Sequence, residues 1–161
     1  QTPWREETIK LFGKEVKQPR LTAWYGDAGC AYTYSGLTLQ PLEWTPTLED
    51  LRQAVAKVAG HPFNSVLLNL YRDGRDSMGW HSDDEAELGQ NPVIASLSLG
   101  ATRRFRLRHR RDRSLPPLRL ELNPSSLLIM AGETQHHWQH QLPKTQKAIG
   151  PRINLTFRHL S

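Results

Sequence analysis

A histidine and an aspartate two positions apart, His81 and Asp83, form the local pattern with the clearest chemical meaning. In an extended segment, side chains at positions i and i+2 point to the same side, so this imidazole and carboxylate could face one ion. A further histidine would complete a face of two histidines and one carboxylate, which leaves coordination positions open. Iron(II) needs such positions for a chelating co-substrate and for dioxygen. The alternative is a loop carboxylate that fixes a surface histidine.

The distant candidates for the third ligand are His136, His137 and His140. His136 and His140 lie four residues apart, a spacing that would also suit a zinc pair on one helix. The flanking Trp138 and Pro143 do not favour a helix there, and no Glu follows His136 to act as a base. The spacing leaves the choice among the three histidines open.

The segment from Arg152 to Arg158 alternates strictly between polar and apolar side chains. This alternation predicts a strand whose apolar side packs into the core. Its polar side places two guanidiniums roughly 13 Å apart along the strand. Because arginine binds a carboxylate through a planar fork, a small dianion between them would meet one arginine at each end. The alternative is an edge strand with a solvated basic face.

Asn69 and Tyr71 have the same i, i+2 relation on another predicted strand, with Leu68 and Leu70 facing the core. They would offer an amide and a phenol as neutral donors toward the same cavity. Otherwise they are polar residues at the end of a strand.

One helix is predicted from about Leu48 to Val58, with Thr47 as its N-cap and Gly60 as its stop. The residues expected to pack this helix on a sheet are Leu48, Leu51, Val55 and Val58. Short strands separated by turns are predicted at 66–71, 93–99, 104–107, 118–122, 126–130 and 153–157. Many short strands after one helix indicate a mainly β (α+β) fold, a sandwich or jelly roll with a supporting helix on its outer face.

The composition narrows the possible functions. The chain has 161 residues, 37% of them hydrophobic, which suits one domain with one core. Cys30 is the single cysteine, so a metal would have to be held by histidines and carboxylates. The net charge of +5 favours an anionic partner. With no apolar run of roughly 20 residues and no secretion signal, we expect a soluble intracellular protein, in the cytoplasm of a bacterium or the nucleus of a eukaryote.

A run of basic residues extends from Arg103 to Arg111. On a strand it would place Arg104, Arg106 and Arg108 on one face. We expect this face to contact nucleic-acid phosphates rather than to be merely solvated.

Taken together, several segments of the sequence resemble the AlkB family of nucleic-acid dealkylating oxygenases. The sequence as a whole is similar to the animal DNA-repair branches of that family. The resemblance runs from about Pro19 to Arg158. The segments that carry it are Trp24-Tyr25-Gly26-Asp27-Ala28-Gly29, Tyr32-Thr33-Tyr34-Ser35-Gly36, Asn69-Leu70-Tyr71, His81-Ser82-Asp83-Asp84-Glu85, Ala95-Ser96-Leu97-Ser98-Leu99-Gly100, Trp138-Gln139-His140 and Pro151-Arg152-Ile153-Asn154-Leu155-Thr156-Phe157-Arg158.

The resemblance implies a double-stranded β-helix, with the iron ligands His81, Asp83 and His140. It makes His136 and His137 non-ligands. Arg152 and Arg158 would bind the two carboxylates of 2-oxoglutarate, and the residues that help them would be Asn69, Tyr71 and Asn154.

For the substrate, the resemblance places Tyr34 against one side of the target base and His81 against the other. The positions that would line the base pocket are Tyr32, Asp84 and Glu85, and further substrate contacts are expected from Arg20 and Arg104. Leu11-Phe12-Gly13 resembles the apolar finger with which the double-strand branch fills the gap left by a flipped base. The segment before Phe12 is short, so the family's N-terminal helices are missing or truncated.

The implied activity is oxidative demethylation of bases of the 1-methyladenine and 3-methylcytosine type, a direct repair that releases formaldehyde. It would use Fe(II), 2-oxoglutarate and O2 on alkylated DNA, single- or double-stranded, with RNA as a further candidate. We expect a monomer, away from membranes, with one domain over 1–161: a nucleotide-recognition segment at 1–36 and the β-helix core at 60–161. The rivals are a protein or metabolite oxygenase, a non-catalytic nucleic-acid-binding module and a zinc hydrolase.

Overall fold

Strands predominate in the computed structural model, which describes residues 1–34 and 37–161. The elements in chain order are β1 (Thr8–Leu11), β2 (Lys14–Lys17), β3 (Leu21–Gly26), β4 (Tyr32–Tyr34), β5 (Leu37–Leu39), α1 (Pro46–Ala59), β6 (Ser65–Tyr71), β7 (Met78–His81), the 3₁₀ turn η1 (Ala86–Leu88), β8 (Ile94–Gly100), β9 (Arg103–His109), β10 (Leu118–Leu122), β11 (Leu127–Met130), α2 (Thr134–His137), β12 (Trp138–Leu142) and β13 (Arg152–Arg158).

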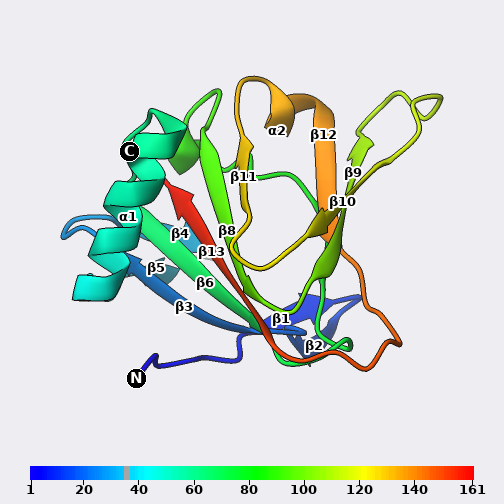
Figure 1. Cartoon of the computed structure of the whole chain (residues 1–161), viewed down its shortest axis with the longest axis horizontal. Coiled ribbons are helices and arrows are strands. Elements are labelled where there is room, and N and C mark those ends of the chain that lie inside the picture. The colour runs from blue at the N-terminus through cyan, green and yellow to red at the C-terminus, as the bar shows by residue number, and fades with distance from the viewer. Residues whose placement is uncertain (35–36) are drawn as a thin grey trace.

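Two antiparallel sheets form the body of the protein (Figure 1). Within the described residues, the major sheet has the strand order β11-β8-β13-β6-β3 and the minor sheet β10-β9-β12-β7. Helix α1 covers the face of the major sheet that points away from the minor sheet. This arrangement confirms the predicted mainly β jelly roll with a helix on its outer face.

Helix α1 begins two residues earlier than the sequence pattern suggests. Its N-cap is Thr45, whose hydroxyl accepts a hydrogen bond from the backbone N–H of Leu48 at 3.2 Å. Pro46 then occupies the first turn, where its missing N–H is not needed. Thr47 is therefore inside the helix, and its prediction as the N-cap was wrong. Gly60 ends the helix in the left-handed conformation, as predicted.

The apolar face of α1 is centred on Leu48 and Val55, which are buried against the major sheet. Val58 is 71% exposed, so its predicted packing on the sheet was wrong. At about 100° per residue, Val58 falls about 80° from the direction of Leu48, at the edge of the apolar face. Ala59 lies closer to that direction and packs against the core instead.

Strand β13 lies in the middle of the major sheet, hydrogen-bonded to β8 on one side and β6 on the other. Its apolar residues Leu155 and Phe157 are buried in the core beneath α1. Its polar residues Arg152 and Asn154 are also buried, on the opposite face, and line the cavity between the sheets. The alternation was therefore read correctly, and the alternative of a solvated edge strand was wrong.

Strand β6 brings a second row of polar side chains next to β13. Asn69 is paired with Asn154, and Tyr71 with Arg152. Asn69 and Tyr71 are buried and line the same cavity, as predicted. On its other side, β6 pairs with β3, so residues 21–26 of the predicted recognition segment are part of the major sheet.

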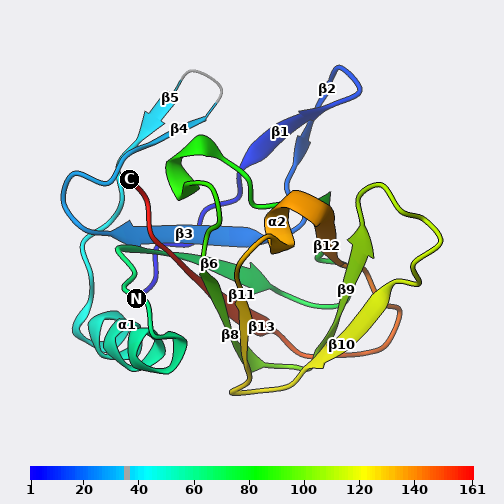
Figure 2. The same cartoon turned by 90° about the horizontal axis from the view of Figure 1, so that it is seen from above.

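Two small hairpins, β1–β2 and β4–β5, project from one side of the molecule, opposite α1 (Figure 2). Phe12 and Gly13 form the tip of the first hairpin with positive φ angles of 51° and 75°. The side chain of Phe12 is 96% exposed. In the described residues, no helix has the length and apolar character needed to cross a membrane.

Candidate metal centre

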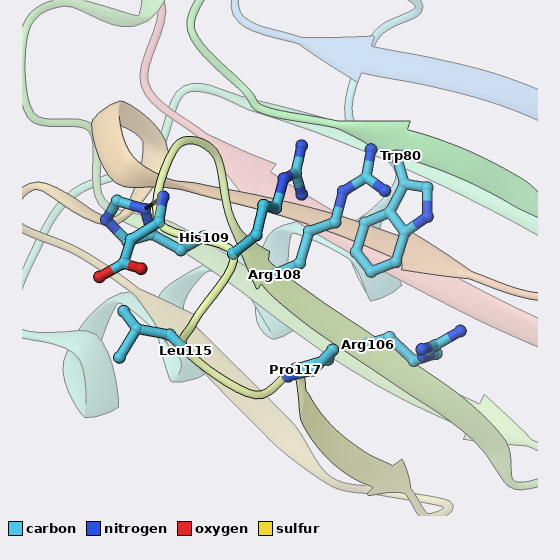
Figure 3. Close-up of a pocket in the computed structure, with 8 residues that line it drawn as sticks. Trp80, Arg106, Arg108, His109, Leu115 and Pro117 are labelled. Carbon is cyan, nitrogen blue, oxygen red and sulfur yellow. Dashed lines mark hydrogen bonds between the residues drawn. The ribbon is translucent and has the colours of Figure 1, made fainter.

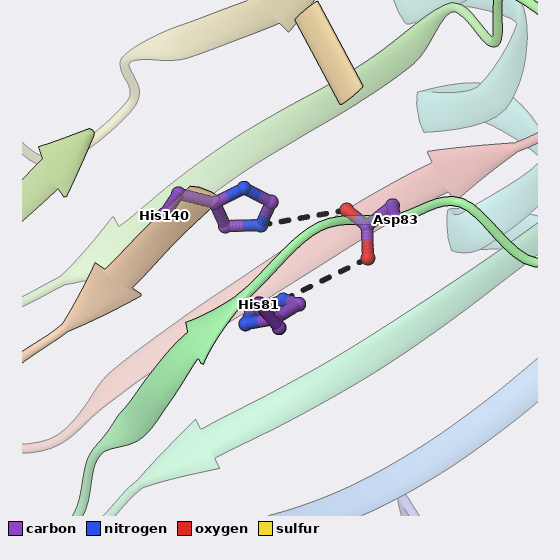
Figure 4. Close-up of side chains that lie close together, drawn as sticks. All are labelled: His81, Asp83 and His140. Atoms are coloured by element: carbon purple, nitrogen blue, oxygen red, sulfur yellow. Dashed lines mark ion pairs between the residues drawn. The ribbon is translucent and has the colours of Figure 1, made fainter. Parts of the chain in front are cut away.

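His81, Asp83 and His140 converge between the sheets, and their ligand atoms all lie within 4.8 Å of one another (Figure 4). The Nε2 atom of His81 is 3.7 Å from Oδ1 of Asp83, and that of His140 is 3.5 Å from Oδ2. Ligands bonded at about 2.1 Å to one ion lie about 3 Å apart at right angles, so a small contraction would close this site on a metal. Among the described residues, this is the one such group of His, Cys, Asp and Glu.

Strand pairing creates the cluster. In the minor sheet β7 and β12 are neighbours, with His81 directly opposite His140 in register. The two rings lie 4.2 Å apart, centroid to centroid. Asp83 follows two residues after the end of β7 and turns back toward both rings. Neither β7 nor β12 was among the predicted strands. β7 has only four residues, and the alternation of β12 is weak because a histidine stands between its two apolar residues.

The surroundings of His81 favour a neutral ring with a free Nε2 lone pair. Its Nδ1 lies 2.8 Å from the carbonyl oxygen of Gly79, and donation of the Nδ1 proton leaves Nε2 to face the cluster. Burial lowers the pKa of His81 and His140 lowers it further, while Asp83 opposes both. A neutral imidazole is the form that binds a metal.

The carboxyl group of Asp83 is ionised although the residue is only 4% exposed. Burial opposes its ionisation, but the guanidinium of Arg158 and the ring of His140 outweigh burial and hold the pKa of Asp83 well below its usual range. The nearest guanidinium nitrogen of Arg158 is 3.2 Å away. A buried carboxylate beside two imidazoles is a suitable ligand set for a divalent transition metal.

The other two histidines near His140 are not part of the cluster. His136 contacts Gln90 and Asn91, and His137 lies 3.6 Å from Glu133. Both are in the single turn α2, whereas His140 is on β12. The helical His136–His140 pair considered from the spacing is therefore not formed.

Arg152 is the strongest sign of an anion site. It is 2% exposed, and its guanidinium donates to Ser98 Oγ at 2.9 Å and lies 5.3 Å from the ring centre of Tyr71. Among the described residues, no carboxylate forms an ion pair with it within 4.0 Å. Because a guanidinium stays protonated even when buried, an uncompensated one is costly and favours an anionic ligand.

Neutral hydrogen-bonding groups continue from Arg152 toward the cluster. Asn154 donates to Ser96 and accepts from Thr156 at 2.6 Å. Burial raises the pKa of Tyr71, against the opposing effect of nearby arginines, so its phenol remains a donor. The free volume is about 40 Å³, and the residues that line it are Asn69, Tyr71, Met78, His81, Asp83, Ser96, Phe105, Leu122, Met130, His140, Leu142, Arg152, Asn154, Thr156 and Arg158.

The residues predicted to contact a substrate lie in several places. Asp84 is 3.5 Å from Arg110, and Glu85 immediately precedes η1. Arg20 donates to the carbonyl of Ser77, and Arg104 is 3.7 Å from Glu121. The backbone of Tyr32 and Tyr34 forms part of β4, and their side chains lie outside the described part of the structure. Their roles, and that of Phe12, remain predictions.

A larger cleft of about 390 Å³ lies on the outer face of the minor sheet (Figure 3). The guanidinium carbon of Arg108 is 4.2 Å from the ring centre of Trp80, and that of Arg106 is 5.6 Å away. Desolvation and the nearby charges of Arg113 and Arg106 lower the pKa of Arg108. We call Trp80, Arg106, Arg108 and Arg113 the arginine cleft. No role was predicted for Trp80 from the sequence. Its position next to His81 was a usable signal, because adjacent residues of a strand point to opposite faces.

Two residues beside the metal ligands were also missed. Gln135 accepts a hydrogen bond from the backbone N–H of Asp83, and Ser82 donates to the carbonyl of Trp138. Neither shows in the sequence, because a lone Gln or Ser carries no spacing signal.

The amino-acid sequence is similar to those of known proteins over nearly its whole length. The chain is 48% identical over 158 residues to "DNA oxidative demethylase ALKBH2" of Homo sapiens, covering 94% of this chain and 60% of the relative. It is 45% identical over 168 residues to human "Alpha-ketoglutarate-dependent dioxygenase alkB homolog 3", covering 97% of this chain and 57% of the relative. The chain thus spans about three fifths of the length of these relatives.

A solved structure of OsALKBH1 has the same fold, with a TM-score of 0.64 at 16% identity, and the alignment covers 99% of this chain and 82% of that one. The AlkB resemblance stated from the sequence is confirmed by the relatives. Residues 1–158 match the description "2OG-Fe(II) oxygenase superfamily". With nearly its whole length matched, the chain belongs to the 2OG-Fe(II) oxygenase superfamily.

Proposed function

We propose that this protein oxidatively demethylates N-alkylated bases in nucleic acid, with Fe(II), 2-oxoglutarate and O2. The observation that carries the proposal is the placement of two complementary sites in one cavity. The His81–Asp83–His140 cluster would provide the metal ligands, and the buried guanidinium of Arg152, with no ion-pair partner among the described residues, lies in the same cavity. A dicarboxylate that chelates the metal could bind the metal at one end and the guanidinium of Arg152 at the other.

The chain's own residues bind and orient the reactants. His81, Asp83 and His140 would hold the metal, and the chemistry it supplies when bound is oxidation of the alkyl carbon on a base nitrogen, which then leaves as formaldehyde. Arg152 would hold one carboxylate of 2-oxoglutarate, with Tyr71 and Asn154 as neutral donors. Phe105 and Leu142 line the same cavity and help to exclude water.

Arg158 would change partners when the co-substrate binds. Its guanidinium now lies 3.2 Å from Asp83. Arg158 contacts Asp83 through one nitrogen, whereas the second carboxylate of 2-oxoglutarate can offer it a planar two-point contact, so it would replace Asp83 as the partner of Arg158. Asp83 would then be left to the metal.

Nucleic acid is the substrate class that best fits the exterior. The arginine cleft places closely spaced guanidiniums beside an aromatic ring, and one relative is named a DNA oxidative demethylase. A base must leave the duplex to reach a buried metal, at a cost of about a few kcal/mol, and an alkylated base pairs poorly and leaves more readily. Tyr34 and His81 would hold it from two sides, next to Tyr32, Asp84 and Glu85. Single-stranded DNA and RNA avoid the cost of flipping and are further candidate substrates.

The central test is a reaction with iron, 2-oxoglutarate and a methylated oligonucleotide, followed by mass spectrometry. We expect loss of the methyl group with formation of succinate, and at least a 100-fold lower rate for His140→Ala, because the metal loses one of three protein ligands. His137→Ala, which removes an exposed neighbouring histidine, should keep nearly full activity. Succinate without demethylation would favour a protein or metabolite substrate. If neither succinate nor demethylated oligonucleotide formed, the result would favour a binding module or a zinc hydrolase.

Phe12 is proposed to fill the gap left by a flipped base, because it is an exposed apolar side chain at a hairpin tip. Phe12→Ala should slow repair of a methylated duplex severalfold and leave repair of the same single strand nearly unchanged. Val58→Ala, which trims an exposed apolar residue on α1, is the matched control. Equal losses on duplex and single strand would remove this role.

The arginine face of β9 and Arg113, which follows β9, are proposed to contact phosphates. Arg106, Arg108 and Arg113 are better placed than Arg104, which is paired with Glu121. If about four arginines bind a duplex, its affinity should fall on the order of 100-fold for a fourfold rise in salt. Arg108→Ala should lower the slope of log Kd against log salt by about 1. Arg75→Ala, an exposed arginine paired with Asp73, should leave the slope unchanged. A flat salt response in the unaltered protein would contradict phosphate contact.

A further inference from the structure

Gln135 is one of the most deeply buried polar side chains of the described residues, at 1% exposure. It lies in α2, a single turn just before β12. Its side-chain oxygen accepts from the backbone N–H of Asp83 at 2.7 Å, across 52 positions of the chain. Its side-chain nitrogen lies 3.7 Å from the sulfur of Met130. A polar side chain buried this deeply between two elements needs a reason beyond filling space.

The two partners of Gln135 determine how its amide is oriented. A backbone N–H can only donate, so the amide oxygen must face Asp83. A thioether can only accept, so the NH₂ group must face Met130. The orientation with the two groups exchanged would oppose a donor to a donor, and the amide is therefore held in one position.

This hydrogen bond links Asp83, one proposed metal ligand, to the segment that leads into His140, another proposed ligand. Asp83 supplies the carboxylate, and Gln135 is five residues before His140. A second bond reinforces the connection, since Ser82 Oγ donates to the carbonyl of Trp138 at 2.7 Å. The segment 82–83 is thus fastened at consecutive residues to the segment 135–138. Where β7 ends, these side-chain contacts take over from strand pairing in positioning Asp83.

We propose that Gln135 is a positioning residue for the metal centre, which holds Asp83 so that its carboxylate stays between His81 and His140. Without this bond, the segment after His81 can move by rotation of its backbone, and the carboxylate moves with it. The proposal rests on the proposed metal site and adds a residue that does not touch the metal.

The test compares Mn²⁺ binding by Gln135→Met and the unaltered protein, measured from the electron paramagnetic resonance signal of free Mn²⁺. Methionine is similarly long and unbranched, but its thioether is only a weak acceptor in place of the amide oxygen that binds the backbone N–H of Asp83. We expect Mn²⁺ affinity to fall about 10- to 100-fold, as for other residues that orient metal ligands. The KM for 2-oxoglutarate, measured at saturating metal, should change by less than about threefold.

Two further variants separate positioning from general stability. Thr45→Ala removes a bond of the same kind at the start of α1, where the backbone N–H of Leu48 donates to a side-chain oxygen. It should lower the melting temperature and leave Mn²⁺ affinity unchanged. Gln135→Glu keeps an acceptor oxygen for Asp83 and, because burial favours its protonated carboxyl, an O–H that can face Met130, so it should keep Mn²⁺ affinity close to that of the unaltered protein.

Unchanged Mn²⁺ affinity in Gln135→Met would overturn the positioning role and leave Gln135 as a structural residue. A loss in Gln135→Glu as large as in Gln135→Met, with both variants folded as judged by circular dichroism, would also overturn it. If the unaltered protein failed to bind Mn²⁺, the metal site itself would be wrong, a result distinct from failure of the role of Gln135.

Discussion

The burial of ionised groups between two sheets is the constraint on which the rest of the structure depends. Asp83 carries a negative charge and Arg152 a positive one in the same cavity, and both are almost fully removed from water. Asp83 is compensated by the guanidinium of Arg158, whereas Arg152 has no carboxylate within ion-pair distance among the described residues. Such charges are tolerated when the fold is rigid and a ligand of opposite charge completes them.

The jelly roll supplies that rigidity. Strand β13 is hydrogen-bonded on both sides and packs its apolar face under α1, so its polar residues are held facing the cavity. The minor sheet contributes His81 and His140 through the pairing of β7 with β12. Each sheet therefore carries one half of the proposed site: β13 and β6 carry the groups proposed to bind the anion, and β7 and β12 carry the imidazoles. The loop after β7 completes the cluster with Asp83.

How much of this was visible in the sequence depends on the range of each interaction. The alternation from Arg152 to Arg158 revealed a strand and the direction of its side chains, because both are local properties. His81 and Asp83 were identified from their spacing, but spacing could not choose among three histidines. That choice depends on the register of β7 and β12, a long-range property, and came from family resemblance. The N-cap was misplaced by two residues because Thr45 and Thr47 both suit the position. Gln135 gave no signal because its role exists only after two distant segments meet.

The linkage between metal and 2-oxoglutarate tests this account most directly. Calorimetric titration of the unaltered protein with 2-oxoglutarate, with and without Mn²⁺, measures whether the two sites belong to one chelate. We expect one equivalent to bind, at least tenfold more tightly with Mn²⁺, because the metal and Arg152 then act on the same molecule. Equal affinity under both conditions, or no binding under either, would contradict the claim that the cavity joins a metal site to a dicarboxylate site.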